Sequence, residues 1–269
     1  IVMLDGDKMG EHLRNADRAQ QRSISDLLSR FALDEARVIV ERCHGVLIYS
    51  GGDDVLAMLP VSQALACAKE LHDSFRNLWK ETGTDREAFV SAGIAVMHLK
   101  EDLRFALDTT RRAEKQAKDS GRNCLALTVC RRSGEHTHVT MPWSFAADDM
   151  QTLVTAFTES ASDRWVYHLM RDRETVMGLP APAGPRLEIR RQLKRSDLQT
   201  RLKLPVDVVL QAFDRYCDFR REPARWPASP AFYRKNAAEQ QQVLGSKAFE
   251  EFVALCQSAS FLARGRDSQ

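Results

Sequence analysis

The sequence predicts an α+β protein, in which a βαββαβ sheet domain is followed by an all-helical domain. In residues 1–145, apolar runs of strand length alternate with helical patterns, and two of these runs are separated only by a glycine-containing corner. After residue 145, every apolar pattern has helical spacing. We therefore expect two domains, residues 1–145 and residues 146–269.

The composition is that of a soluble globular protein. The 269 residues suffice for two domains with separate cores, and 43% hydrophobic and 28% charged residues are ordinary values. A formal net charge of +2 does not by itself indicate nucleic-acid binding. Six cysteines without a CxxC pair predict buried free thiols in a reducing compartment. No apolar run approaches the roughly 18 residues of a membrane span, so we expect a cytoplasmic protein.

The chain begins with a short apolar strand, residues 1–4, which leads into Asp5-Gly6-Asp7. The polar stretch 11–22 is interpreted as a loop or a frayed helix start. Ser23 is the expected N-cap of a helix that continues to residue 43 and stops at Gly45.

Residues 45–60, GVLIYSGGDDVLAMLP, predict a β-hairpin whose corner is Gly51-Gly52. Glycine adopts positive φ without a Cβ clash and lets a ligand approach the backbone. The hairpin therefore presents Asp53 and Asp54 at its tip.

The next elements complete the sheet domain. Ser62 is the expected cap of an amphipathic helix that ends before Gly83, and a buried strand is expected over residues 89–99. A helix over 103–118, a turn at 121–123 and a strand over 125–130 follow, and 131–145 is interpreted as an edge hairpin and linker. The resulting βαββαβ order is the ferredoxin-like arrangement. The central hairpin argues against a Rossmann sheet, whose parallel strands need crossovers.

The second half is expected to be helical throughout, with a stiff proline-rich linker at residues 179–185. The expected helices are residues 145–172, 187–202, 206–220, 230–244 and 247–262.

Four aspartates are candidate metal ligands: Asp5, Asp7, Asp53 and Asp54. Adjacent carboxylates repel each other unless a cation or protons offset their charge. A carboxylate at the end of one strand can meet those of a neighbouring hairpin and complete a site for Mg²⁺ or Mn²⁺. The alternative for the isolated DGD motif is an ordinary turn.

The motifs DGDKMG, YSGGDD and AKDSGRN carry a family resemblance. They resemble the catalytic palm of the large, polymerase-like subunit of type III CRISPR effector complexes, and are most similar to the III-B branch. That palm is related to diguanylate cyclases and class III nucleotidyl cyclases, and the resemblance covers about residues 1–145. Because the chain begins inside a strand, we expect it to be the C-terminal portion of a longer polypeptide.

The resemblance implies a nucleotidyltransferase that converts ATP to cyclic oligoadenylates in a complex with other subunits, a guide RNA and a target RNA. It implies catalytic roles for Asp5, Asp53 and Asp54. The implied nucleotide-binding residues are Ser50, Gly51, Gly52, Lys118 and Arg122.

Other interpretations stay open. The chain is alternatively a diguanylate or mononucleotide cyclase, although Lys8 and the Asp54-Val55 pair depart from the diguanylate cyclase pattern. A second alternative is a catalytically silent module that binds RNA or subunits. His136 and His138 are interpreted as surface residues rather than a metal pair. A basic segment is interpreted as a solvated helix face, with RNA or subunit binding as the alternative. It consists of Arg186, Arg190, Arg191, Lys194, Arg195, Arg201 and Lys203.

Overall fold

The computed structural model describes residues 1–159, 162–200, 206–227 and 229–264. The chain divides into two compact units, Ile1–Trp143 and Ser144–Gln269. The first unit contains the sheet and the second is helical.

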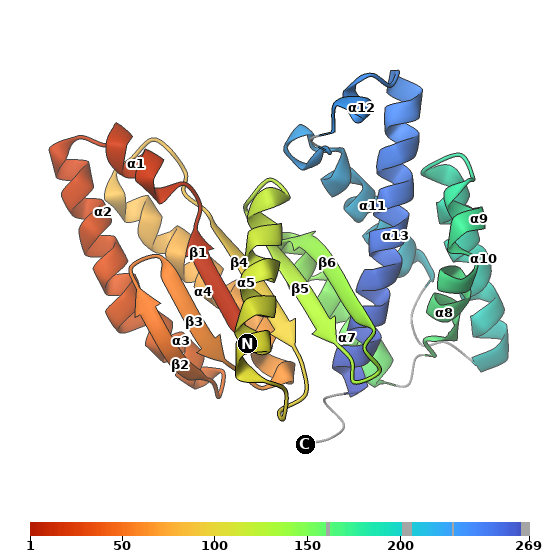
Figure 1. Ribbon diagram of the computed structural model, residues 1–269, viewed down its shortest axis with the longest axis horizontal. Helices are drawn as coiled ribbons and strands as arrows, with labels where there is room; N and C mark the ends of the chain where they lie inside the picture. Colours follow the sequence, from red (N-terminus) through yellow and green to blue (C-terminus); the bar gives the residue numbers. More distant parts are fainter. Residues whose placement is uncertain (160–161, 201–205, 228, 265–269) are drawn as a thin grey trace. The chain divides into compact units, whose positions relative to one another are not determined.

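The first unit is built on a six-stranded sheet with the order β2-β3-β1-β4-β5-β6 (Figure 1). The strands are β1 Val2–Gly6, β2 Val46–Gly51, β3 Asp54–Met58, β4 Val90–Val96, β5 Cys124–Cys130 and β6 His136–Pro142. The pairs β2–β3, β3–β1 and β1–β4 are all antiparallel, which is the ferredoxin-like arrangement. Strand β5 then pairs parallel to β4, and β6 pairs antiparallel to β5 at the edge. The predicted α+β palm fold is confirmed.

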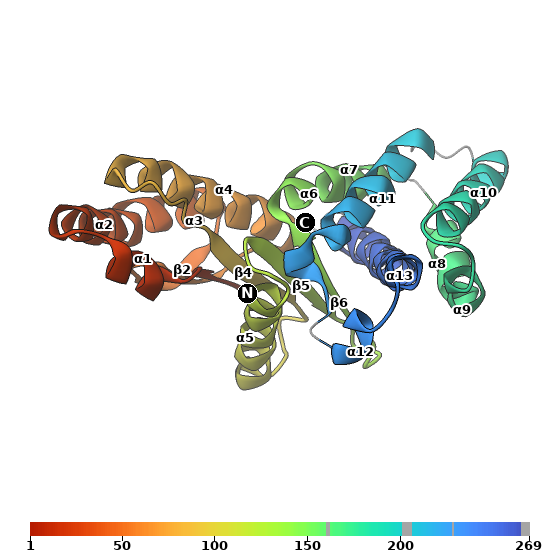
Figure 2. The ribbon, with the colours of Figure 1, turned by 90° about the horizontal axis from the view of Figure 1, so that it is seen from above.

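Helices cover both faces of this sheet. The helical elements of the first unit are α1 Met9–Asn15, α2 Arg18–Arg30, a π-helix Phe31–Glu35, α3 Ala36–Arg42, α4 Val61–Trp79, a 3₁₀ turn Lys80–Thr82 and α5 Leu103–Asp119. Figure 2 shows α2, α3 and α4 on one face and α5 on the other. The alternation of β1 explains this arrangement: Val2 and Leu4 are fully buried, whereas Asp5 points to the α5 face and contacts Lys118.

Helix α5 lies directly against β4 because a glycine provides the space. A Cβ atom on Gly93 would come within 2.2 Å of the Glu114 backbone nitrogen and 2.7 Å of the Thr110 carbonyl oxygen. Such distances are far inside van der Waals contact, so any side chain at Gly93 would push the helix off the strand. This close approach fixes the height of α5 above the sheet.

Several predicted helix boundaries are wrong. The polar stretch 11–22 contains the end of α1 and the start of α2, which Asp17 caps in a reciprocal capping box with Gln20. Ser23 therefore lies inside α2 rather than at its start. The left-handed residue that follows α3 is His44, with φ of 57°, and not Gly45. Ser62 makes no cap, since α4 begins at Val61 directly after Pro60.

The buried His72 of α4 makes the stability of the fold depend on pH. Its ring stacks on Trp143 with centroids 4.4 Å apart, and Nδ1 lies 3.0 Å from an Asp73 oxygen. Nε2 is buried without a hydrogen-bond partner among the described residues. Burial lowers the pKa of His72 to about 4, although Asp73 opposes the shift.

We expect the native chain to lose up to about 3 kcal/mol of unfolding free energy as the pH falls from 6.5 to 4. The unfolded state binds a proton at His72 over that range and the folded state does not, so acid favours unfolding. Urea unfolding at both pH values tests this, with His72→Phe expected to flatten the dependence. A His98→Phe control, at an exposed position, should retain it. An unchanged slope in His72→Phe would contradict the expectation.

The second unit is helical, as predicted. Its helices are α6 Trp143–Ala147 (which begins in the first unit), α7 Asp149–Thr158, α8 Arg164–Arg171, α9 Arg173–Met177, α10 Ala183–Thr200, α11 Val206–Arg221, a 3₁₀ turn Pro223–Arg225, α12 Pro230–Tyr233 and α13 Ala237–Arg264. The predicted break between residues 244 and 247 is wrong, because α13 runs continuously through Gly245. A Cβ there would come within 2.5 Å of the Ala181 Cβ, so this glycine admits the proline-rich linker.

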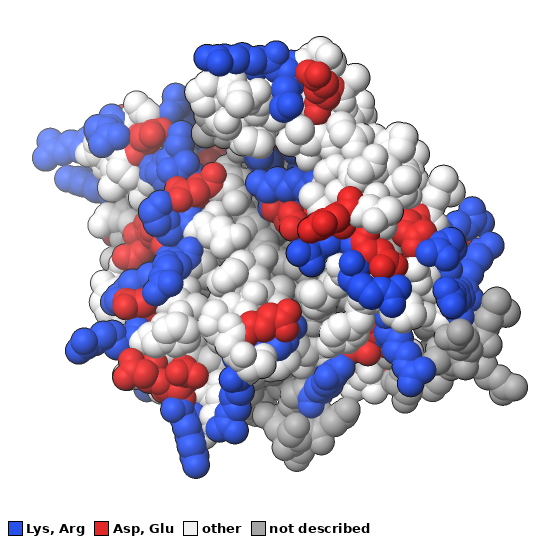
Figure 3. Space-filling view, turned by 45° about the vertical axis from the view of Figure 1, so that its right-hand side comes forward, with Lys and Arg blue, Asp and Glu red and all other residues white. Residues whose placement is uncertain are grey.

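The basic segment is partly neutralised. Arg186 pairs with Asp214 at 2.9 Å and Arg191 with Glu188 at 2.6 Å, while Arg201 and Lys203 lie outside the described residues. Basic and acidic side chains lie among one another on the face shown in Figure 3. These pairs favour the solvated-face interpretation. No helix of the described ranges is both long and apolar enough for a membrane span.

Candidate metal centre

Three of the four predicted metal ligands lie together at one end of the sheet. Each of Asp5, Asp53 and Asp54 offers a carboxylate oxygen, and these oxygens lie within 4.8 Å of one another. The β1–β3 register explains the meeting: Leu4 pairs with Val55, so the next antiparallel position sets Asp5 opposite Asp54. We call these three residues the acidic cluster.

The hairpin corner lies one residue beyond the predicted position. Gly51 pairs with Asp54 as the last residue of β2, which leaves Gly52 and Asp53 as the two turn residues. Gly52 has φ of 78°, a conformation that glycine adopts readily. The turn therefore directs Asp53 toward the end of β1 rather than along the hairpin.

Asp53 is held by direct contact with the DGD motif. Its carboxylate is hydrogen-bonded to the backbone of Gly6. A Cβ on Gly6 would come within 2.4 Å of Asp53 Oδ2, so glycine is required for this approach. Burial raises the pKa of Asp53, and the neighbouring Asp54 raises it further. Burial also raises the pKa of Asp54.

Asp7, the fourth predicted ligand, does not lie in the acidic cluster. Its buried carboxylate accepts hydrogen bonds from Ser91 Oγ at 2.8 and 2.9 Å and from the Asn123 backbone N–H at 2.9 Å. It thereby ties the end of β1 to β4 and to the turn after α5. The structure gives Asp7 a structural role, and we do not retain it as a ligand.

Lys118 reaches the acidic cluster from the last turn of α5. Its ammonium forms an ion pair with Asp5 and a second one, at 2.8 Å, with Glu114. Burial lowers the pKa of Lys118, and Arg122 contributes in the same direction. Arg122 itself is exposed and has φ of 64° in the turn after α5.

Glu114 is a site residue that the sequence analysis missed. Burial raises the pKa of its carboxyl to about 6, with Asp54 and Asp7 adding to the shift. Its spacing of four residues from Lys118 on a helix places both on one face, which was the available signal. The charges of the site are thus unbalanced: carboxylates outnumber the nearby cations.

Ser50, a predicted nucleotide-binding residue, lies in β2 near the corner of the hairpin. It pairs with Val55 across β2 and β3, and its Oγ is buried with no hydrogen-bond partner among the described residues. Buried hydroxyls normally have a partner. Because Ser50 is paired with Val55, its side chain lies on the face of the hairpin opposite to Asp54, and the structure does not place this hydroxyl in the acidic cluster.

The residues present fit a divalent cation. Mg²⁺ and Mn²⁺ prefer carboxylate oxygens, and the cluster presents them from two converging chain segments. Burial raises the pKa of Asp53 and of Asp54, so a positive charge beside them would favour their ionised forms. A bound cation would supply that charge.

His136 and His138, which the sequence analysis weighed as a metal pair, are not part of the acidic cluster. His138 Nδ1 lies 3.0 Å from Thr128 Oγ1, and His136 is exposed on the same edge strand, which agrees with the interpretation of both as surface histidines.

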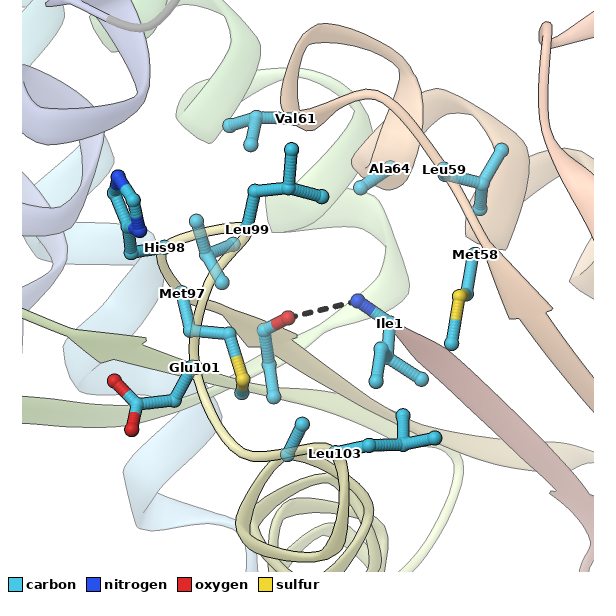
Figure 4. A pocket seen from close by; sticks show the side chains of 13 residues that line it. Ile1, Met58, Leu59, Val61, Ala64, Met97, His98, Leu99, Glu101 and Leu103 are labelled. Carbon is cyan, nitrogen blue, oxygen red and sulfur yellow. Dashed lines mark hydrogen bonds between the residues drawn. The ribbon is translucent and has the colours of Figure 1, made fainter.

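An apolar pocket of about 250 Å³ lies at the other end of the β1–β4 pair, lined by residues such as Met58, Met97 and Leu103 (Figure 4). Its lining suits apolar atoms, and we do not assign it to a charged nucleotide.

Comparison with known proteins points to one family. Residues 1–126 match the model of the Cas10/Cmr2 second palm domain. The CRISPR system Cmr subunit Cmr2 of Pyrococcus furiosus is 31% identical over 159 residues, which cover 57% of this chain and 18% of that protein. The solved structure of Csm1 from T. onnurineus is similar, with a TM-score of 0.56 and 15% identity over 94% of this chain and 37% of that one.

A Csm1-Csm4 cassette in complex with cA4 is also similar, with a TM-score of 0.53 and 15% identity. That match covers 94% of this chain and 36% of the other. The chain therefore spans a minor part of each of these proteins. At this identity the two structures support the fold alone.

Proposed function

We propose that this chain, whose residues 1–126 match the Cas10/Cmr2 second palm domain, belongs to a type III CRISPR large subunit and is a metal-dependent nucleotidyltransferase. The proposed reaction converts ATP into cyclic oligoadenylates. The acidic cluster of Asp5, Asp53 and Asp54 is the observation that carries this proposal. The similar Csm1-Csm4 cassette was solved in complex with cA4, which supports a nucleotide as the ligand proposed here.

In this proposal the acidic cluster holds two divalent ions, Mg²⁺ or Mn²⁺. Bound there, the ions would lower the pKa of an attacking ribose hydroxyl and stabilise the leaving pyrophosphate. Asp53 is positioned by its contact with Gly6, and Asp5 by its place at the end of a buried strand. The protein thus sets the ligand geometry before the nucleotide arrives.

Of the remaining predicted residues, the two basic ones suit a triphosphate. Lys118 presents an ammonium at Asp5, and Arg122 follows in the turn after α5. Gly52 leaves the backbone of the corner open to a ligand, whereas the Tyr49 side chain covers Gly51. Ser50 lies on the face opposite to Asp54, so its unpaired hydroxyl does not add to the support for the site.

The partners follow from the family. We propose that the chain works in a ribonucleoprotein with other type III CRISPR subunits, a guide RNA and a target RNA, in the cytoplasm. The helical unit is the proposed contact region for those partners.

Product analysis tests the proposed function. The assembled complex is incubated with target RNA, Mn²⁺ and either ATP or GTP, and the products are separated by chromatography. We expect cyclic oligoadenylates from ATP and no cyclic product from GTP. Cyclic products from GTP would favour a diguanylate cyclase instead. No product from either nucleotide, in a complex that still binds its target RNA, would favour a silent scaffold.

A further inference from the structure

Lys118 forms ion pairs with two carboxylates, one inside the acidic cluster and one outside it. Asp5 belongs to the acidic cluster, whereas Glu114 lies outside it, four residues back on the same helix. The side chains of Lys118 and Glu114 are only 24% and 14% exposed, so water screens these pairs incompletely. The Lys118 ammonium therefore contacts the acidic cluster directly, through Asp5.

A divalent cation and this ammonium compete for the same carboxylate. Two cations held a few ångströms apart repel each other strongly in a half-buried site. A metal ion on Asp5 therefore requires the ammonium to leave or to share that carboxylate. Glu114 offers it a second anion, within reach of the same side chain, so the lysine does not need to become unpaired.

When the ammonium leaves Asp5, we expect only the Lys118 side chain to move. Helix α5 packs with its backbone at Glu114 directly over Gly93, so we expect the helix to keep its place while the Lys118 side chain moves. A lysine side chain has four rotatable bonds, and its ammonium can rotate about them at little cost.

We propose that Lys118 is a built-in competitor for the metal site, which a divalent cation displaces from Asp5 onto Glu114. This inference rests on the proposed function and concerns the regulation of the same site. In the displaced position the ammonium is held by Glu114 and no longer by Asp5, so it is available to bind the triphosphate beside the metal site. Metal binding thereby prepares the lysine for the nucleotide.

Mn²⁺ binding without nucleotide tests the proposal. The full chain is titrated with Mn²⁺, and free Mn²⁺ is measured by electron paramagnetic resonance. Lys118→Met should tighten binding at least about threefold, because the competing charge is removed. The control is Lys115→Met on the same helix, whose ammonium pairs with Asp119 and is 73% exposed. Unchanged or weaker binding by Lys118→Met would overturn the proposal.

A double-mutant cycle gives a second measurement. Glu114→Gln should weaken Mn²⁺ binding more in the native background than in Lys118→Met, because the displaced ammonium loses its second partner. Equal effects in the two backgrounds would contradict the displacement. Thermal melting of each variant checks the fold, and Lys118→Gln, which keeps a hydrogen-bond donor, serves if Lys118→Met does not fold.

The two proposals fail in distinguishable ways. If a variant without Asp53 and Asp54 binds Mn²⁺ as tightly as the native chain, the acidic cluster is not the metal site and the proposed function fails. If that variant loses binding while Lys118→Met leaves it unchanged, only the competition fails.

Discussion

Replacing both Asp53 and Asp54 with alanine should reduce ATP conversion by the assembled complex at least about a thousandfold. The two substitutions remove two of the three carboxylates of the acidic cluster, and Asp5 alone cannot hold the proposed ions. The melting temperature should stay unchanged or rise. Burial raises the pKa of both groups, so their charged forms are disfavoured in the fold at neutral pH. Product chromatography and thermal melting measure the two effects.

A matched double variant separates the site from charge removal in general. Asp26 and Asp34 are exposed residues of α2 and the π-helix, so Asp26→Ala with Asp34→Ala removes the same charge far from the cluster in sequence. This control should retain activity. If the Asp53 and Asp54 double variant still makes product with Mn²⁺ present, the catalytic assignment is wrong.

Local sequence was enough to predict the elements that bring the acidic cluster together. Two apolar runs joined by a glycine corner encode the hairpin, and a buried strand before Asp5 encodes its neighbour. Once β3 pairs antiparallel with β1, the position of Asp5 relative to Asp54 follows from the register. The sequence analysis gave a catalytic role to Asp5 and not to Asp7, but it kept Asp7 as a metal ligand, because only the tertiary structure shows Ser91 and Asn123 beside Asp7.

One feature that the sequence analysis missed depends on a contact between distant segments. The spacing of four residues links Glu114 to Lys118, but the packing of α5 over Gly93, which places Glu114 at the site, is a contact that no local pattern records. The α2 start was misplaced for the opposite reason. Its capping box, Asp17 with Gln20, is a local signal that was overlooked because the stretch has few apolar residues.

Substituting Gly6 with alanine should disable the site without removing a ligand. The new Cβ would come within 2.4 Å of Asp53 Oδ2 and 2.5 Å of Met9 Cγ, so both side chains must move. Gly6 is not among the glycines with positive φ, and the effect is therefore steric rather than conformational. We expect Mn²⁺ affinity and ATP conversion to fall at least about tenfold and stability to fall by about 1–3 kcal/mol.

The matched control is Gly10→Ala, at a helical glycine of α1 whose nearest contact for a new Cβ is Arg14 Nη1 at 3.5 Å. Alanine favours a helix over glycine by up to about 1 kcal/mol, so this variant should be as stable as the native chain or more so. Titration with Mn²⁺ and urea unfolding compare the two. Native-like metal affinity in Gly6→Ala would mean that Asp53 does not need its close approach to the strand end. The DGD glycine would then serve only as a turn residue, and the coupling between the first strand and the hairpin corner would have to lie in Asp5 alone.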